Sequence, residues 1–190
     1  MMATTPPTVL LVPGWRDSGP AHWQSHWERA LGDGPVSRVR LANSQWEHPR
    51  RDDWVRVLTD AVHAAAATGP VVVVAHSLGC IAVRHLPEPV AACLAGALFV
   101  APADPERRAV LADFAPVPYG PLPYPSIVVG STDDPYCPVR KAAKYARSWG
   151  SRMVRLANAG HVNAESGYGP WPEGRALLDE LLATPALEPA

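Results

Sequence analysis

The stretch that decides the fold is Val71-Val-Val-Val-Ala-His-Ser-Leu-Gly-Cys-Ile81. Four consecutive valines predict a buried strand, and the small residues after them predict a sharp turn into a helix. Ser77 lies at this turn, with Ala75 two residues before it and Gly79 two residues after it. This is the nucleophile-elbow pattern G-x-S-x-G with Ala in place of the first Gly. We therefore predict that Ser77 is a nucleophile; an ordinary strand-to-helix turn is the alternative.

The composition excludes several classes of function. The chain has 190 residues, a formal net charge of −1 and 18% charged residues, so it shows no electrostatic sign of nucleic-acid or membrane binding. Its three cysteines lack C-x-x-C spacing, which favours reduced cytosolic thiols over disulfides or a zinc site. The N-terminus lacks a signal-peptide pattern. We expect a cytoplasmic protein with a single domain, residues 1–190, and loose termini at 1–7 and 184–190.

Apolar runs alternate with helical patterns along the chain. Strands are expected at residues 9–12, 36–41, 71–74, 97–100, 127–130 and 153–156. Helices are expected over 18–31, 52–67, from the elbow to about 87, over 139–149 and over 173–182. The pattern predicts an α/β fold of about six mostly parallel strands flanked by helices. We interpret 36–41 as an edge strand, 43–49 as a loop, and 101–125 as a loop-rich insert too short for a cap domain.

A nucleophilic serine needs a base, which in turn needs an orienting group. In α/β-hydrolases the chain order is Ser, acid, His. His161 follows the last predicted strand and is the candidate base, with an ordinary surface-loop histidine as the alternative. Asp134 is the favoured acid, and Asp133 and Asp104 remain open alternatives. An Asp that is not the acid is expected to cap a turn or a helix.

Three other histidines are weaker candidates. His76 adjoins Ser77, but neighbours on a turn point apart, so it is not expected to be the base. His22 and His26 lie four residues apart on a predicted helix. They lack a third ligand or an H-E-x-x-H pattern, so we interpret them as helix-surface or pocket-edge residues. No metal is expected.

Acyl transfer also needs two backbone donors for the oxyanion. The amide of Leu78, directly after the nucleophile, is one candidate. The amide of Trp15, in the loop after the first strand, is the other. The Trp15 side chain is expected to narrow the acyl pocket, or else to lie in the core.

Together these segments resemble the small serine hydrolases of the retinoblastoma-binding protein and YdeN family, a compact branch of the α/β-hydrolases. The resemblance spans roughly residues 8–183 and rests on Val-Pro-Gly-Trp-Arg-Asp-Ser-Gly-Pro at 12–20, His-Trp-Gln at 22–24, His-Ser-Leu-Gly at 76–79, Gly-Ser-Thr-Asp-Asp-Pro-Tyr at 130–136 and Gly-His-Val-Asn at 160–163. It implies a Ser77–Asp134–His161 triad and no cofactor. The retinoblastoma-binding pattern L-x-C-x-E is missing, because residues 78–82 end in Ala. That partner is therefore not expected, and any protein partner stays open.

The resulting hypothesis is acyl-transfer hydrolysis of a small ester in an open, shallow site. A peptidase or thioesterase with the same triad is an alternative, and so is a binding or scaffold protein with an idle triad. Arg16, Asp17, Asn163 and Glu165 are interpreted as loop hydrogen-bonding residues in preference to direct substrate contacts.

Overall fold

The computed structural model describes residues 6–32 and 34–183. Within these ranges a six-stranded sheet has the order β2-β1-β3-β4-β5-β6, and all paired strands are parallel. The strands are β1 (Thr8–Val12), β2 (Val36–Arg38), β3 (Val71–His76), β4 (Leu94–Val100), β5 (Ser126–Ser131) and β6 (Arg152–Leu156). The termini expected to be loose fall outside the described residues, apart from residues 6 and 7.

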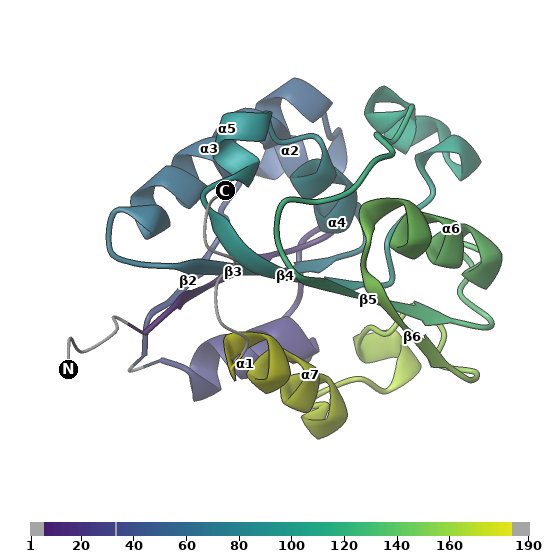
Figure 1. Ribbon diagram of the computed structural model, residues 1–190. Coiled ribbons are helices and arrows are strands. Elements are labelled where there is room, and N and C mark those ends of the chain that lie inside the picture. The colour runs from purple at the N-terminus through teal and green to yellow at the C-terminus, as the bar shows by residue number, and fades with distance from the viewer. Residues whose placement is uncertain (1–5, 33, 184–190) are drawn as a thin grey trace.

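Helices cover both faces of the sheet. They are α1 (Trp23–Ala30), α2 (Asn43–Glu47), α3 (Arg51–Ala66), α4 (Leu78–Arg84), α5 (Glu88–Ala91), α6 (Val139–Trp149) and α7 (Pro172–Ala183). Short 3₁₀ helices are η1 (Pro105–Arg107), η2 (Ala109–Phe114) and η3 (Ala164–Ser166). Figure 1 shows α1 and α7 on one face, and α2 to α6 on the other. The predicted α/β architecture is confirmed.

Strand alternation divides the core into two layers. Val71 and Val73 of β3 belong to the cluster that packs against α3, α4 and α6. Val72 and Val74 belong to the other cluster, with the tryptophans of α1 and the leucines of α7. Because both faces of β3 are buried, its sequence is a continuous apolar run without polar alternation.

Two details differ from the sequence-based expectations. Residues 43–49 were expected to form a loop, but α2 lies there. The Gln45 side chain accepts from the Ala42 N–H, and the Trp46 ring packs edge-on against Trp54 with centroids 5.4 Å apart. The insert at 101–125 contains η1 and η2, and η2 buries Phe114 in the core. The edge-strand expectation is correct, although β2 is shorter than predicted.

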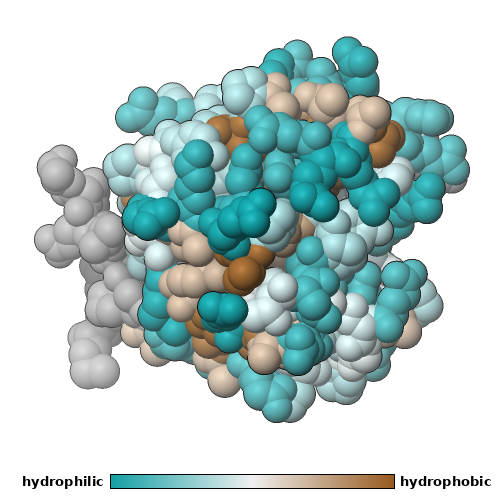
Figure 2. All heavy atoms as spheres, turned by 90° about the vertical axis from the view of Figure 1, so that its right-hand side faces the viewer, coloured by the Kyte–Doolittle hydropathy of each residue, from teal (hydrophilic) through white to brown (hydrophobic). Residues whose placement is uncertain are grey.

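Parallel strands bring their carboxyl ends to one edge of the sheet, which is where α/β proteins bind ligands. In Figure 1 this edge lies at the right. Figure 2 looks onto that side and shows a mostly hydrophilic surface with a few apolar residues gathered near its middle. None of the helices in the described ranges is long and apolar enough to cross a membrane.

Candidate active site

Ser77 occupies a strained turn between β3 and α4. Its φ is 54° and its ψ is −119°, a region that a residue with a Cβ rarely adopts. Such strain costs on the order of 1–3 kcal/mol and persists only where the surroundings enforce it. A Cβ on Gly79 would lie 2.5 Å from the Pro13 carbonyl oxygen, and one on Gly14 would lie 2.8 Å from the Ser77 Cβ. The packing around the turn thus requires glycine at 79, as the elbow pattern predicts.

The structure brings Ser77, His161 and Asp134 into one hydrogen-bonded chain. His161 Nε2 lies 2.8 Å from Ser77 Oγ. On the other side of the ring, His161 Nδ1 lies 2.9 Å and 3.0 Å from the two carboxylate oxygens of Asp134. Since the carboxylate can only accept, Nδ1 carries the proton and Nε2 is free to accept from the Ser77 hydroxyl. Ser77 and His161 are buried, with 7% and 6% of their surface exposed.

The loop that carries His161 is held from two sides. Ser131 Oγ, at the end of β5, accepts from the Ala159 N–H at 3.0 Å. Trp23 of α1 donates its indole N–H to the Val162 carbonyl oxygen at 2.8 Å. The Tyr136 ring packs against the His161 imidazole, with centroids 4.3 Å apart. The histidine ring therefore has a defined orientation beside Ser77.

The alternative acids have other partners. Asp133 Oδ1 accepts from the Ser131 hydroxyl at 2.7 Å and from the Gly160 N–H at 2.8 Å. These two hydrogen bonds, the hydroxyl first, lower the pKa of Asp133. Asp104 caps η1 through the Glu106 N–H and pairs with Lys141. Asp104 thus has the capping role expected of an Asp that is not the acid, whereas Asp133 joins the end of β5 to the loop that carries His161.

Two neutral histidines lie beside His161. His76 donates its Nε2 proton to the His161 carbonyl oxygen at 2.9 Å. It therefore helps to hold the backbone of the base and is not the hydrogen-bond partner of Ser77. Burial holds the pKa of His76 well below its usual value, and the charge of His161 is the next largest cause. His22 is the N-cap of α1, and its Nδ1 accepts from the Gln24 N–H at 3.2 Å.

His22 is therefore a buried pocket residue, which corrects the helix-surface part of the earlier interpretation. Burial lowers its pKa to about 3, with smaller contributions from the charges of Arg38 and His161. Its ring packs edge-on against His76, with centroids 4.7 Å apart. Its Nε2 is buried without a hydrogen-bond partner among the residues the structure covers.

The two predicted oxyanion donors belong to the turn after β3 and the loop after β1. Leu78 is the first residue of α4, where a helix has backbone N–H groups without intrahelical partners. Trp15 lies in a turn closed by the Asp17 N–H donating to the Gly14 carbonyl oxygen at 3.1 Å. The Trp15 side chain is half-buried and lines the same cavity as Ser77, as expected of a residue that narrows the pocket.

A cavity of about 350 Å³ opens at Ser77. Its lining residues are Trp15, Arg16, Asp17, Gly19, His22, His76, Ser77, Leu111, Tyr136, His161, Asn163, Ala164 and Glu165.

Of the four cavity residues predicted to form hydrogen bonds within loops, Asn163 and Asp17 have that role. Asn163 Oδ1 accepts from the N–H and the hydroxyl of Ser166, and Asp17 accepts from the Ser18 N–H. The Arg16 guanidinium instead stacks over the Trp15 ring at 4.4 Å.

Sequence reasoning missed some cavity residues. Leu111 comes from η2, inside the insert that was expected to be irregular. Tyr136 ends the motif at 130–136 that contains Asp134, and this position could have suggested a place near the base. Two residues outside the cavity, Gln24 and Arg38, hold the loop after β1. Gln24 lies in the His-Trp-Gln segment that carries the family resemblance, but nothing in that segment indicated this role. Arg38 had no signal beyond being an arginine on an edge strand.

Comparison with known proteins bears on the family of the chain. A sequence model of the family described as serine hydrolase matches residues 9–180. A YdeN-like hydrolase from Pectobacterium atrosepticum has 35% identity and a TM-score of 0.81, with 92% of this chain and 90% of that chain covered. No protein with curated function matches the sequence.

More distant structures share the fold. The ydeN gene product of Bacillus subtilis is 22% identical with a TM-score of 0.75, and the match covers 94% of this chain and 100% of that one. Esterase 2 of Thermogutta terrifontis, solved after phosphonylation by cyclosarin, is 18% identical with a TM-score of 0.68 over 94% and 82% of the two chains. At these identities the likeness concerns the fold.

Proposed function

We propose that this chain, which belongs to the serine hydrolase family and so to the α/β-hydrolase superfamily, hydrolyses small carboxylic esters by acyl transfer. The observation that carries the proposal is the hydrogen-bonded chain from Ser77 through His161 to Asp134. It joins a strained, pocket-facing hydroxyl to a correctly oriented imidazole. A protein that uses the fold only as a scaffold has no need for this arrangement.

In the proposed reaction, Ser77 Oγ attacks the ester carbonyl carbon while His161 Nε2 takes the hydroxyl proton. Asp134 stabilises the resulting imidazolium through Nδ1 and stays ionised. Collapse of the tetrahedral intermediate breaks the ester C–O bond, and His161 gives its proton to the leaving alcohol. Water then attacks the acyl-enzyme with His161 again as base, which releases the acid and restores Ser77.

The amides of Leu78 and Trp15 are assigned to the oxyanion. Leu78 directly follows Ser77, and Trp15 lines the cavity with it; each amide would donate to the carbonyl oxygen as it becomes negative. The neutral state of His22 and His76 suits this chemistry, because a second positive charge beside His161 would disfavour the imidazolium. The cavity of about 350 Å³ favours a small acyl group over a long chain.

The test is covalent labelling with a fluorophosphonate probe, which reacts with activated serines. The wild-type protein should be labelled, and Ser77→Ala should not. Ser126→Ala is the matched control, because it removes another buried serine hydroxyl. Ser126 Oγ lies 2.7 Å from Ser151 Oγ and does not line the cavity. Labelling of the control but not of Ser77→Ala supports an activated Ser77.

The absence of labelling in folded wild-type protein would refute the hydrolase mechanism and favour a binding role. If labelling succeeds, kinetic comparison of a short p-nitrophenyl ester, the matching thioester and an aminoacyl amide tests the ester assignment. The ester should give the highest kcat/KM. A higher value for the thioester or the amide would reassign the enzyme to the thioesterases or the peptidases.

A further inference from the structure

The loop after β1 contains two adjacent residues in the left-handed backbone region. Arg16 has a φ of 69° and Asp17 a φ of 64°, and neither is a glycine. Such a conformation persists only where neighbouring groups impose it. The loop also carries Trp15, the residue whose amide is assigned to the oxyanion hole, and Gly14, where a Cβ would lie 2.8 Å from the Ser77 Cβ.

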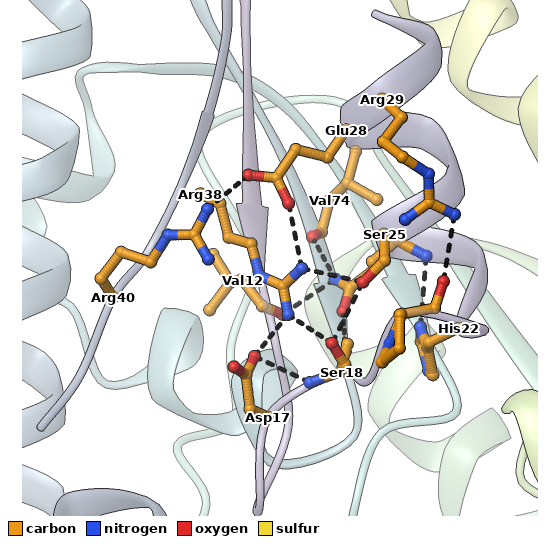
Figure 3. Close-up of polar contacts among 12 residues, drawn as sticks. Val12, Asp17, Ser18, His22, Ser25, Glu28, Arg29, Arg38, Arg40 and Val74 are labelled. Atoms are coloured by element: carbon orange, nitrogen blue, oxygen red, sulfur yellow. Dashed lines mark hydrogen bonds and ion pairs between the residues drawn. The ribbon is translucent and has the colours of Figure 1, made fainter. Parts of the chain in front are cut away.

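Arg38 of β2 is the centre of the contacts that hold this loop (Figure 3). Its Nη2 donates to the Asp17 carboxylate and to the Ser18 carbonyl oxygen, the latter at 2.7 Å. Its Nη1 donates to Ser25 Oγ at 2.9 Å and to Glu28 Oε2 at 3.0 Å. The side chain is only 4% exposed, so these bonds are largely shielded from water.

Gln24 anchors the same loop from below. Its side chain donates to the carbonyl oxygen of Val12, the last residue of β1, and to that of Val74 within β3, each at 3.1 Å. Its own oxygen accepts from the Ser18 hydroxyl at 2.7 Å. The loop is thus tied at Ser18 to the sheet and at Asp17 to the edge strand, with α1 between them.

We propose that Arg38 is a positioning residue for the oxyanion hole. It acts through Asp17 and Ser18 to hold the Trp15 amide at the distance from Ser77 that the tetrahedral intermediate requires. This inference rests on the proposed hydrolase function. It assigns a catalytic consequence to a residue on the edge strand that does not line the cavity.

The test compares Arg38→Met with Arg40→Met. Arg40 lies two residues further along the chain and also pairs with Glu28, at 2.6 Å, but its side chain is 67% exposed and does not bond to the loop. Arg38→Met should fold, since the Asp17 and Glu28 side chains it leaves are 35% and 27% exposed and can be hydrated. Circular dichroism checks the fold of each variant.

Arg38→Met should lower kcat by about 10- to 100-fold with little change in KM. Here kcat is calculated from the concentration of active sites that the fluorophosphonate probe titrates. A displaced oxyanion donor weakens binding of the transition state more than binding of the substrate. Affinity for phenylboronic acid should fall by a similar factor, because its adduct with Ser77 places a boronate oxygen in the oxyanion hole. Arg38→Lys should be intermediate, and Arg40→Met should match the wild type.

Hydrogen exchange provides a readout that is independent of turnover. Amides of residues 15–18 should exchange faster in Arg38→Met than in Arg40→Met.

Asp17→Asn is the second variant if Arg38→Met does not fold, because it keeps an acceptor oxygen but removes the charge. It should lower kcat and speed up amide exchange in the same way. Equal kcat, boronate affinity and exchange in folded Arg38→Met and Arg40→Met would overturn the inference. An inactive, unlabelled wild type would refute the proposed function instead, and exchange at 15–18 would then decide whether Arg38 holds the loop.

Discussion

Acidification should destabilise the folded protein through His22. In the folded state its Nδ1 accepts from the Gln24 N–H, a bond that only the unprotonated nitrogen can make. The side chain is buried, with 5% of the residue exposed, and Arg38 is nearby. Burial first and the Arg38 charge second lower the pKa of His22 from 6.5 to about 3.

The sign of the effect follows from the two pKa values. Between pH 6.5 and pH 3 the unfolded chain binds a proton at His22 that the folded protein does not, so stability falls as the pH falls. The stabilisation is fully present above pH 6.5. The slope is about 1.4 kcal/mol per pH unit, which amounts to roughly 2 kcal/mol lost between pH 8 and pH 5. His76, whose pKa is also lowered, acts in the same direction.

The measurement is urea unfolding of wild type and His22→Asn, followed by tryptophan fluorescence at several pH values. Asparagine keeps an oxygen that can cap α1 but does not titrate. The variant should therefore lose about 2 kcal/mol less than the wild type between pH 8 and pH 5. His63→Asn, on an exposed position of α3, is the control and should show the wild-type pH dependence. Identical pH profiles for wild type and His22→Asn would refute the reasoning.

Three further changes test other parts of the structure. Asp134→Asn should lower kcat by about 10⁴-fold in an ester hydrolysis assay, because the amide can neither hold the base in its tautomer nor stabilise its charge; a loss below tenfold would argue for another acid. Gly79→Ala should lower the free energy of unfolding by about 1–3 kcal/mol in urea denaturation, because its Cβ would lie 2.5 Å from the Pro13 oxygen; wild-type stability would show that the elbow can widen. Iodoacetamide should modify exposed Cys93 but not Cys80 in the native protein, since burial raises the pKa of the Cys80 thiol; mass spectrometry of native and unfolded samples decides this.

The fold was predictable from the sequence because its strongest signals are local. The valine run of β3 is apolar at every position, which is the pattern of a strand buried on both faces. The small residues around Ser77 follow from the close approach of strand and helix at the elbow. The chain order of Ser77, an acid and His161 restricted the candidate base to a residue after the last strand, and the structure places His161 beside Ser77.

The choice among neighbouring side chains depended on tertiary structure. Asp133 and Asp134 are adjacent and follow the same strand, but one faces the Gly160 N–H and the other faces the His161 ring. Adjacent residues point in different directions, and their partners come from a loop 27 residues further along the chain. Sequence could favour Asp134 but could not describe what Asp133 holds.

The burial of the His22 and Arg38 side chains could not be predicted from the sequence for the same reason. His22 lies at the start of α1, and the apolar spacing of that helix does not indicate that His76, 54 residues further along the chain, packs against the His22 ring. An arginine on an edge strand is usually solvent-exposed, yet the Arg38 side chain is buried, because Asp17 and the residues before α1 contact it. Local spacing reports the period of a helix or strand, whereas the burial of a polar side chain depends on which distant segments supply its hydrogen-bond partners.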